Sequence, residues 1–304
     1  MHTMITRRTR RSSTKNRRTA AAWVVVRGWV CGVLGFALSA LGTPALASQT
    51  DLVAQFNALQ GQMEASPLKH AMLLQSSETA NGLRGDVYAI VEHPVQNIGT
   101  AFSDPNHWCE TMLLHLNNRA CTVANNAGAA VITLSVVRKF DQPVTGAFRI
   151  PFDFHVKEST PQHVEVQLYS KSGPLGTSNY RISLEAVSIS AQRSFLHFSY
   201  SYEEGFMARA GTLAYLSLFG SAKIGFTIVG KNADGSPSYI KGTRGLMERN
   251  AMRYFLAIDT YLAVTGDAHA RWNAWYNASE QYPQQLHELD LATYLAIKTT
   301  DAHH

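Results

Sequence analysis

The stretch 243–265, TRGLMERNAMRYFLAIDTYLAVT, carries the longest clean helical pattern in the chain. Its apolar residues recur at spacings of four, three, one, three and four, at Met247, Ala251, Tyr254, Phe255, Ile258 and Leu262. This spacing places them on one face of an α-helix. Strand patterns precede the stretch, and a long amphipathic helix that follows an antiparallel sheet covers the apolar face of that sheet. The space between them is either a packed core or a ligand cavity, and that choice decides the function.

The segments upstream of this helix alternate apolar and polar residues with a period of two. Five of them are 148–156, 164–168, 180–184, 196–202 and 224–228. Such alternation predicts an antiparallel sheet with one buried face and one wet face. The segment 130–137 is apolar on both sides, which predicts a central strand. Asn81 and Gly82 predict a tight hairpin between 70–77 and 83–92.

Helical spacing is also found outside the long stretch. It predicts a short helix at 48–65 and two short helices after residue 94, the second capped by Asp104 before Pro105. Other expected helices are 205–219, 268–282 and 284–299, the last two separated at Pro283.

The amino-terminal region has the composition of a secretory leader. Residues 1–47 hold 8 of the 27 Lys and Arg residues and none of the 22 acidic residues, so the remainder has a formal net charge of −3. A nucleic-acid partner is therefore not expected. A basic region is followed by the uncharged run 28–41 and by small residues at Ala45 and Ala47, which predicts cleavage after Ala47 and a periplasmic or secreted protein. The alternative is an uncleaved segment that anchors the chain in the inner membrane.

Removal of the leader leaves two cysteines, Cys109 and Cys121, with 11 residues between them. In an oxidising compartment this number predicts one disulfide. The alternative is a zinc site that adds His107 and His115, although the spacing does not match the paired ligands typical of zinc sites.

The order of the predicted elements is a strand, two short helices, about six more strands and a long helix. With the stretches GDVYAIVEHP (85–94) and DPNHWCETMLLHL (104–116), this order resembles the START-like helix-grip fold, also called the SRPBCC superfamily. The segment 245–262 also resembles an exported proteobacterial family, which implies no function. The departures from the superfamily pattern are the helix at 205–219, the helical tail and the disulfide.

The resemblance implies an α+β fold, in which a curved antiparallel sheet of about seven strands wraps the long helix and encloses an apolar cavity. The expected organisation is a signal peptide (1–47), a helical lead-in (48–66), the helix-grip domain (67–265) and a helical appendage (266–304). In this fold the cavity accommodates lipids, sterols or polyketides.

The residues expected to line the cavity combine inward positions of the strands with the apolar stripe of the helix. They are Phe152, Phe154, Tyr180, Phe198, Tyr200, Tyr202, Phe226, Met247, Tyr254 and Ile258. The alternative is a filled core, because protein interiors normally pack without voids. The tyrosines favour a cavity, since a buried hydroxyl needs a polar partner.

Several charged residues are candidates for chemistry. Arg244 and Glu248 are four residues apart, which predicts a solvated ion pair on the helix, and Arg249 and Arg253 are expected to form a docking surface for the tail. The acid or base candidates are Glu92, His93, Glu203 and Glu204. No pattern places two of them at a working distance, so no catalytic residue, metal or cofactor is assigned.

The sequence therefore predicts an exported protein that binds or carries a lipid or other apolar small molecule between the sheet and the long helix. One alternative is a cyclase or hydrolase that uses the same cavity. The other is a non-catalytic interaction protein that docks a partner through its helical tail. A membrane surface or a protein is the further partner considered.

Overall fold

The computed structural model describes residues 44–126, 128–206, 208–212 and 223–302. All of them belong to one compact unit, Gly42–His304. The fold is α+β, as predicted, and its main sheet contains eight antiparallel strands instead of the expected seven or so. No described helix is both long and apolar enough to cross a membrane.

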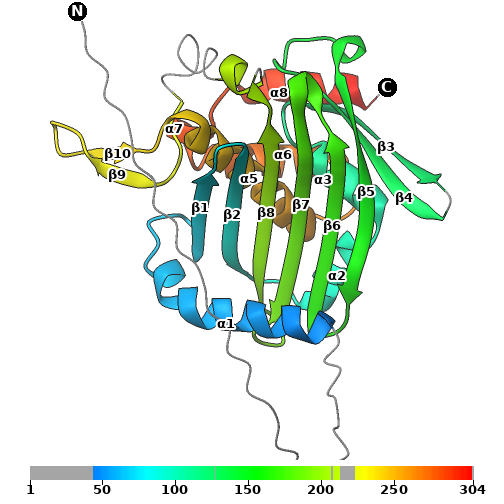
Figure 1. Ribbon diagram of the computed structural model, residues 1–304, viewed down its shortest axis with the longest axis vertical. Coiled ribbons are helices and arrows are strands. Elements are labelled where there is room, and N and C mark those ends of the chain that lie inside the picture. The colour runs from blue at the N-terminus through cyan, green and yellow to red at the C-terminus, as the bar shows by residue number, and fades with distance from the viewer. Residues whose placement is uncertain (1–43, 127, 207, 213–222, 303–304) are drawn as a thin grey trace, which may run out of the picture. The chain divides into compact units, whose positions relative to one another are not determined.

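The main sheet has the strand order β1-β2-β8-β7-β6-β5-β4-β3 (Figure 1). Its strands are β1 (Met72–Glu78), β2 (Gly82–Val91), β3 (Asn118–Asn126), β4 (Ala129–Val136), β5 (Phe148–Ser159), β6 (His163–Ser172), β7 (Thr177–Ser188) and β8 (Ser194–Glu204). The hairpin predicted at Asn81 and Gly82 joins β1 to β2 and is confirmed. Strands β1 and β3 form the two edges.

Two strand predictions are wrong. Strand β4 corresponds to the predicted central strand, but it lies next to the edge strand β3, and only its Ile132 and Leu134 are buried. Small residues such as Ala130 tolerate this half-covered position, so an apolar run did not require burial on both sides. Residues 224–228 do not join the main sheet, because the Phe226 amide donates to the Glu248 carboxylate instead of to a strand. β9 (Ile228–Lys231) pairs only with β10 (Pro237–Tyr239).

The predicted long helix is confirmed as α5 (Gly242–Ala263), which packs on β1, β2 and β8. A long helix on one face of an antiparallel sheet agrees with the expected helix-grip arrangement. Gly85 of β2 makes the close approach possible, since a Cβ built there would lie 3.0 Å from the Cβ of Ala251 and 3.1 Å from Cγ of Met247. Both distances are shorter than ordinary packing contacts, so a larger residue at 85 would push α5 away from the sheet.

The two short helices are α2 (Val95–Phe102) and α3 (Pro105–Met112), as predicted. Asp104 caps α3 by accepting a hydrogen bond from the Asn106 amide at 2.8 Å. Of the expected helix 205–219, residues 206 and 208–212 are helical, and the remainder lies outside the described residues except for the non-helical Gly205.

The tail packs against α5 and, through its last helix, against the edge strand β3. It contains α6 (Ala268–Ser279), α7 (Pro283–Leu286) and α8 (Leu291–Asp301). The single helix expected at 284–299 is wrong. His287 adopts an extended conformation after α7, and Asp290 begins α8 by accepting from the Thr293 amide at 2.9 Å. Trp275 and Tyr294 stack with a centroid distance of 5.3 Å, which joins α6 to α8.

The helix α1 (Pro44–Glu64) crosses one end of the outer face of the sheet, in front of the lower ends of the strands in Figure 1. Its Leu52 and Met63 form a small second core with Val187 and Phe195. The cleavage expected after Ala47 falls in the first turn of this helix and stays a prediction.

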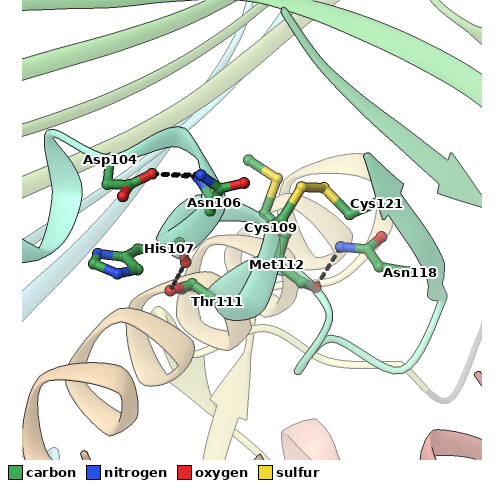
Figure 2. The surroundings of a disulfide bond; sticks show 8 residues. All are labelled: Asp104, Asn106, His107, Cys109, Thr111, Met112, Asn118 and Cys121. Atoms are coloured by element: carbon green, nitrogen blue, oxygen red, sulfur yellow. Dashed lines mark hydrogen bonds between the residues drawn. A yellow bond between two sulfur atoms is a disulfide. The ribbon is translucent and has the colours of Figure 1, made fainter. Parts of the chain in front are cut away.

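A disulfide joins Cys109 of α3 to Cys121 of β3, with a Cα–Cα distance of 5.3 Å, as predicted (Figure 2). It uses both thiols, so the zinc hypothesis loses its two thiolate ligands. Next to it, the Asn118 side chain donates to the Met112 carbonyl at 2.8 Å. These two links hold α3 against the edge strand.

Candidate functional site

Six of the ten expected ligand-binding residues form one aromatic cluster between the sheet and α5. We define this aromatic cluster as Phe152, Tyr180, Phe198, Tyr200, Tyr202 and Tyr254, whose rings are linked by centroid distances of 5.1 to 6.4 Å. Five members come from β5, β7 and β8 and one from α5. Because alternate residues of a strand point to the same face, the period-two pattern predicted their common side.

The other four expected residues lie outside these ring contacts. Phe154 and Ile258 are buried in the same core, and Met247 packs over Gly85 of β2. Phe226 is also buried in this core, but its ring contacts that of Tyr282 in the tail, with a centroid distance of 5.4 Å, because it does not belong to a strand of the main sheet. The role of all ten as ligand contacts stays a prediction.

The tyrosines of the cluster differ in exposure although all are deep in the protein. Tyr180 is 6% exposed, whereas Tyr200, Tyr202 and Tyr254 are half-buried. Burial raises the pKa of Tyr180 to about 12, and it also raises the pKa of the other three. All four phenols therefore stay protonated at neutral pH and act as neutral hydrogen-bonding groups.

Polar side chains meet the phenol groups of the cluster. The Tyr180 hydroxyl donates to Oγ1 of Thr177 at 2.8 Å, and Nδ2 of Asn118 donates to the Tyr254 hydroxyl at 3.4 Å. Sequence reasoning missed both partners, since neither belongs to an apolar pattern. The interior is thus an aromatic surface with a few polar groups, the composition that small-molecule sites share.

Glu204 is a charged residue that bonds a member of this cluster. It is the last inward-facing residue of β8 and is 5% exposed. Its Oε1 accepts from the Tyr202 hydroxyl at 3.4 Å and from Oγ1 of Thr212 at 3.1 Å. The sequence could have indicated this position, because continuing the alternation of 196–202 by one step places residue 204 on the same face of the strand as Tyr202.

The other acid or base candidates lie elsewhere. Glu203 faces the outer side of β8 and accepts from Nδ2 of Asn179 at 2.7 Å, and Glu92 forms an exposed ion pair with Arg193. No hydrogen bond or ring contact joins the described side chains of Glu92, His93 and Glu203 to the aromatic cluster. The structure therefore does not assemble an acid and base pair from these four residues.

The solvated ion pair expected between Arg244 and Glu248 is wrong. Glu248 is fully buried and accepts four hydrogen bonds, from the side chains of Ser76 and Thr227 and from the amides of Phe226 and Thr227, at 2.7 to 2.9 Å. Arg244 instead donates to Ser76. Local spacing predicted the pair, but the carboxylate is drawn into the core by donors that are distant in sequence.

The docking surface expected at Arg249 and Arg253 is confirmed. Both guanidinium groups bond Oε1 of Glu288, in the connection between α7 and α8, and Lys223 contacts the same oxygen at 3.1 Å. Burial opposes ionisation of Glu288, but Arg253, Lys223 and Arg249 outweigh it and lower its pKa to about 2. This cluster fastens the tail to α5.

A second polar region lies under the tail. Lys298 is 2% exposed and donates to the carbonyl oxygens of His115 and Asn118 at 2.9 and 3.0 Å, and burial lowers its pKa to about 7. A cleft of about 280 Å³ lies beside it, among α3, α6 and α8, and is lined in part by Trp272 and Arg271. Among the described residues, none of the ten expected ligand contacts lines this cleft.

No protein family and no curated protein sequence matches this chain. A solved structure from Thermus thermophilus is similar, with a TM-score of 0.41, 9% identity, 60% of this chain covered and 99% of that chain. Norcoclaurine synthase from Thalictrum flavum, in complex with dopamine and hydroxybenzaldehyde, has a TM-score of 0.37 and 11% identity, with 64% and 98% covered. An aromatase/cyclase from Streptomyces has a TM-score of 0.30 and 11% identity, with 66% and 94% covered. This degree of likeness assigns neither a substrate nor an activity to the chain.

Proposed function

We propose that this protein binds and carries an apolar small molecule, such as a lipid, between α5 and the inner face of the sheet. The observation that carries the proposal is the exposure of Tyr200, Tyr202 and Tyr254. These residues are half-buried, yet burial is the main cause that raises the pKa of each phenol. A side chain that keeps exposed surface deep inside a protein borders a space that small molecules can enter. In a filled core, the rings would be as buried as Phe198, which is 1% exposed.

The chemistry of the surrounding groups supports the same function. The aromatic cluster offers apolar surface, and Asn118, Thr177 and Glu204 add a small number of polar atoms. A site of this composition shields the apolar surface of a ligand from water and orients it through a few hydrogen bonds.

We also propose that the chain works outside the cytoplasm. Two observations support this: the basic and then apolar composition of residues 1–47, and the disulfide between Cys109 and Cys121. Disulfides persist in oxidising compartments and are rare in the cytosol. Detection of the chain starting at Ser48 in a periplasmic or culture fraction would support export, and exclusive recovery of the full-length chain in the cytosol would contradict it.

The binding proposal is tested by native mass spectrometry of the purified chain 48–304, followed by titration with an environment-sensitive fluorescent acyl probe. We expect a bound small molecule or saturable binding of the probe. Tyr200→Ala changes the wall of the interior and is expected to alter the probe Kd at least tenfold. Tyr88→Ala is the matched control, because Tyr88 stacks on His197 at the outer face of the sheet.

Two results would contradict the binding proposal. A protein that is empty as purified and binds neither the probe nor any member of a lipid panel does not carry apolar molecules. Equal effects of Tyr200→Ala and Tyr88→Ala on the probe Kd would place binding outside the proposed interior.

A further inference from the structure

The end of the interior formed by the last residues of β8 contains a buried acid with an incomplete set of partners. Glu204 is 5% exposed, and both hydrogen bonds that it accepts go to Oε1. No described residue donates a hydrogen bond to Oε2. Both donors are neutral hydroxyl groups, so neither neutralises the charge of the carboxylate.

The described basic residues that flank 213–222 in the sequence are already engaged. Arg209, on the helical turn after β8, donates to Glu78 at 2.6 Å and to the carbonyls of Thr79 and Ala80. Lys223 bonds Glu288 of the tail. The sequence of the internal residues outside the described ranges, 127, 207 and 213–222, contains no Lys, Arg or His. Among the described residues, no basic side chain bonds Glu204.

A largely buried carboxylate without a counter-ion costs free energy, because burial removes most of the water that would stabilise its charge. A cation supplied by a ligand would remove this cost. The neighbouring aromatic rings favour the same partner. Tyr202, whose hydroxyl bonds Glu204, stacks on Tyr180 with a centroid distance of 5.1 Å and an interplanar angle of 15°. Tyrosine faces attract organic cations through the ring quadrupole.

We propose that the ligand of this protein is an amphipathic molecule whose polar end is an organic cation, a protonated amine or a quaternary ammonium. Glu204 is its counter-ion, the rings of Tyr180 and Tyr202 form the wall beside its head group, and the apolar part lies along the rest of the aromatic cluster. This inference rests on the proposed function and narrows it. Anionic amphiphiles such as fatty acids are excluded from the same orientation, because their carboxylate would face Glu204.

The test uses three probes that share an alkyl chain of the same length: dodecyltrimethylammonium, dodecanol and dodecanoate. Each is titrated by calorimetry into the protein chain 48–304, the two ionic probes below their micelle concentrations and dodecanol below its aqueous solubility. We expect the ammonium to bind at least tenfold more tightly than the alcohol, and the carboxylate to bind more weakly than the alcohol. Glu204→Gln is expected to reduce the ammonium preference to less than threefold while dodecanol still binds. Glu203→Gln is the matched control on the outer side of β8, and this variant is expected to prefer the ammonium over the alcohol by the same factor as the wild type.

The outcomes separate the two proposals. Equal binding of all three probes by the wild type overturns the cationic head group and leaves apolar binding intact, and this result needs no variant. Binding of none of them counts against both proposals. If Glu204→Gln does not fold, Tyr202→Leu tests the same wall, and an unchanged ammonium preference in that variant overturns the inference.

Discussion

The attachment of the tail through Glu288 leads to a quantitative prediction about pH. The pKa of Glu288 is about 2 in the folded protein against 4.5 as the ordinary value. Its side chain is 22% exposed, so solvent screens it only in part. A carboxyl whose pKa is lowered by folding contributes stability above its unfolded pKa, and this stability is lost as pH falls through the folded pKa. The difference of 2.5 units corresponds to about 3 kcal/mol at pH 7.

We therefore expect Glu288→Gln to lower the free energy of unfolding by about 3 kcal/mol at pH 7, since it also leaves Arg249 and Arg253 without their shared carboxylate. At pH 3 the unfolded chain holds a proton on residue 288 that the folded wild type mostly lacks. The contribution then falls to about 1.4 kcal/mol, so the gap between wild type and variant narrows by about 2 kcal/mol.

The assay is urea unfolding of both proteins at pH 7, 5, 4 and 3 under non-reducing conditions, followed by circular dichroism. Glu280→Gln is the control in the same tail, because Glu280 pairs with the exposed His287 and is expected to change stability by less than about 0.5 kcal/mol. A gap between wild type and Glu288→Gln that is constant from pH 7 to pH 3 would refute the electrostatic account. A gap no larger than that of the control would refute the attachment itself.

Three further predictions concern other links in the fold. Replacing both Cys109 and Cys121 by Ala is expected to lower the free energy of chemical unfolding by about 3 kcal/mol, since a disulfide across a separation of 12 residues restricts the unfolded chain. If the variant remains less stable than a wild type whose disulfide has been reduced, this reasoning is contradicted. Folding lowers the pKa of Lys298 from 10.5 to about 7, so between these pH values the unfolded chain binds a proton on this lysine that the folded chain lacks. The free energy of unfolding of the wild type relative to Lys298→Met should therefore rise by about 2 kcal/mol from pH 7 to 9. A difference between the two proteins that does not change with pH would show that the lysine stays charged in the folded state. Burial opposes the charge on His163, but hydrogen bonds to Glu185 and Glu158 raise its pKa above 6.5. The protonated ring therefore stabilises the fold below pH 6.5, and this stabilisation is lost as pH rises through the folded pKa. An NMR titration of the ring that gives a pKa at or below 6.5 would disprove this.

The candidate site was predictable where it depends on strand alternation. Tyr180, Phe198, Tyr200 and Tyr202 were expected to share a face, because a strand directs alternate side chains to the same side. The partners Asn118 and Thr177 were not predicted, since their roles depend on contacts between elements that no local pattern encodes. Phe226 fitted the alternation equally well, but its segment lies outside the main sheet.

Glu248 shows the same limit for charge. Its spacing from Arg244 predicted an exposed pair, and an exposed pair requires only local helical geometry. In the fold, Ser76 of β1 and the amides of Phe226 and Thr227 converge on the carboxylate. Those donors come from segments 21 to 172 residues away, so only the folded chain brings them to the helix.

The sequence by itself determined the elements whose formation depends on nearby residues: the long helix α5, the short helices α2 and α3, of which Asp104 caps the second, the first hairpin and the alternating strands. Periodicity and capping act over a few residues, and the fold preserves them. The tertiary structure alone decided that β4 lies near an edge, that β9 leaves the main sheet, and that Glu248 and Glu288 join α5 to distant segments. These outcomes depend on which buried polar groups find partners, because an unpaired group in the interior costs more than a local preference contributes.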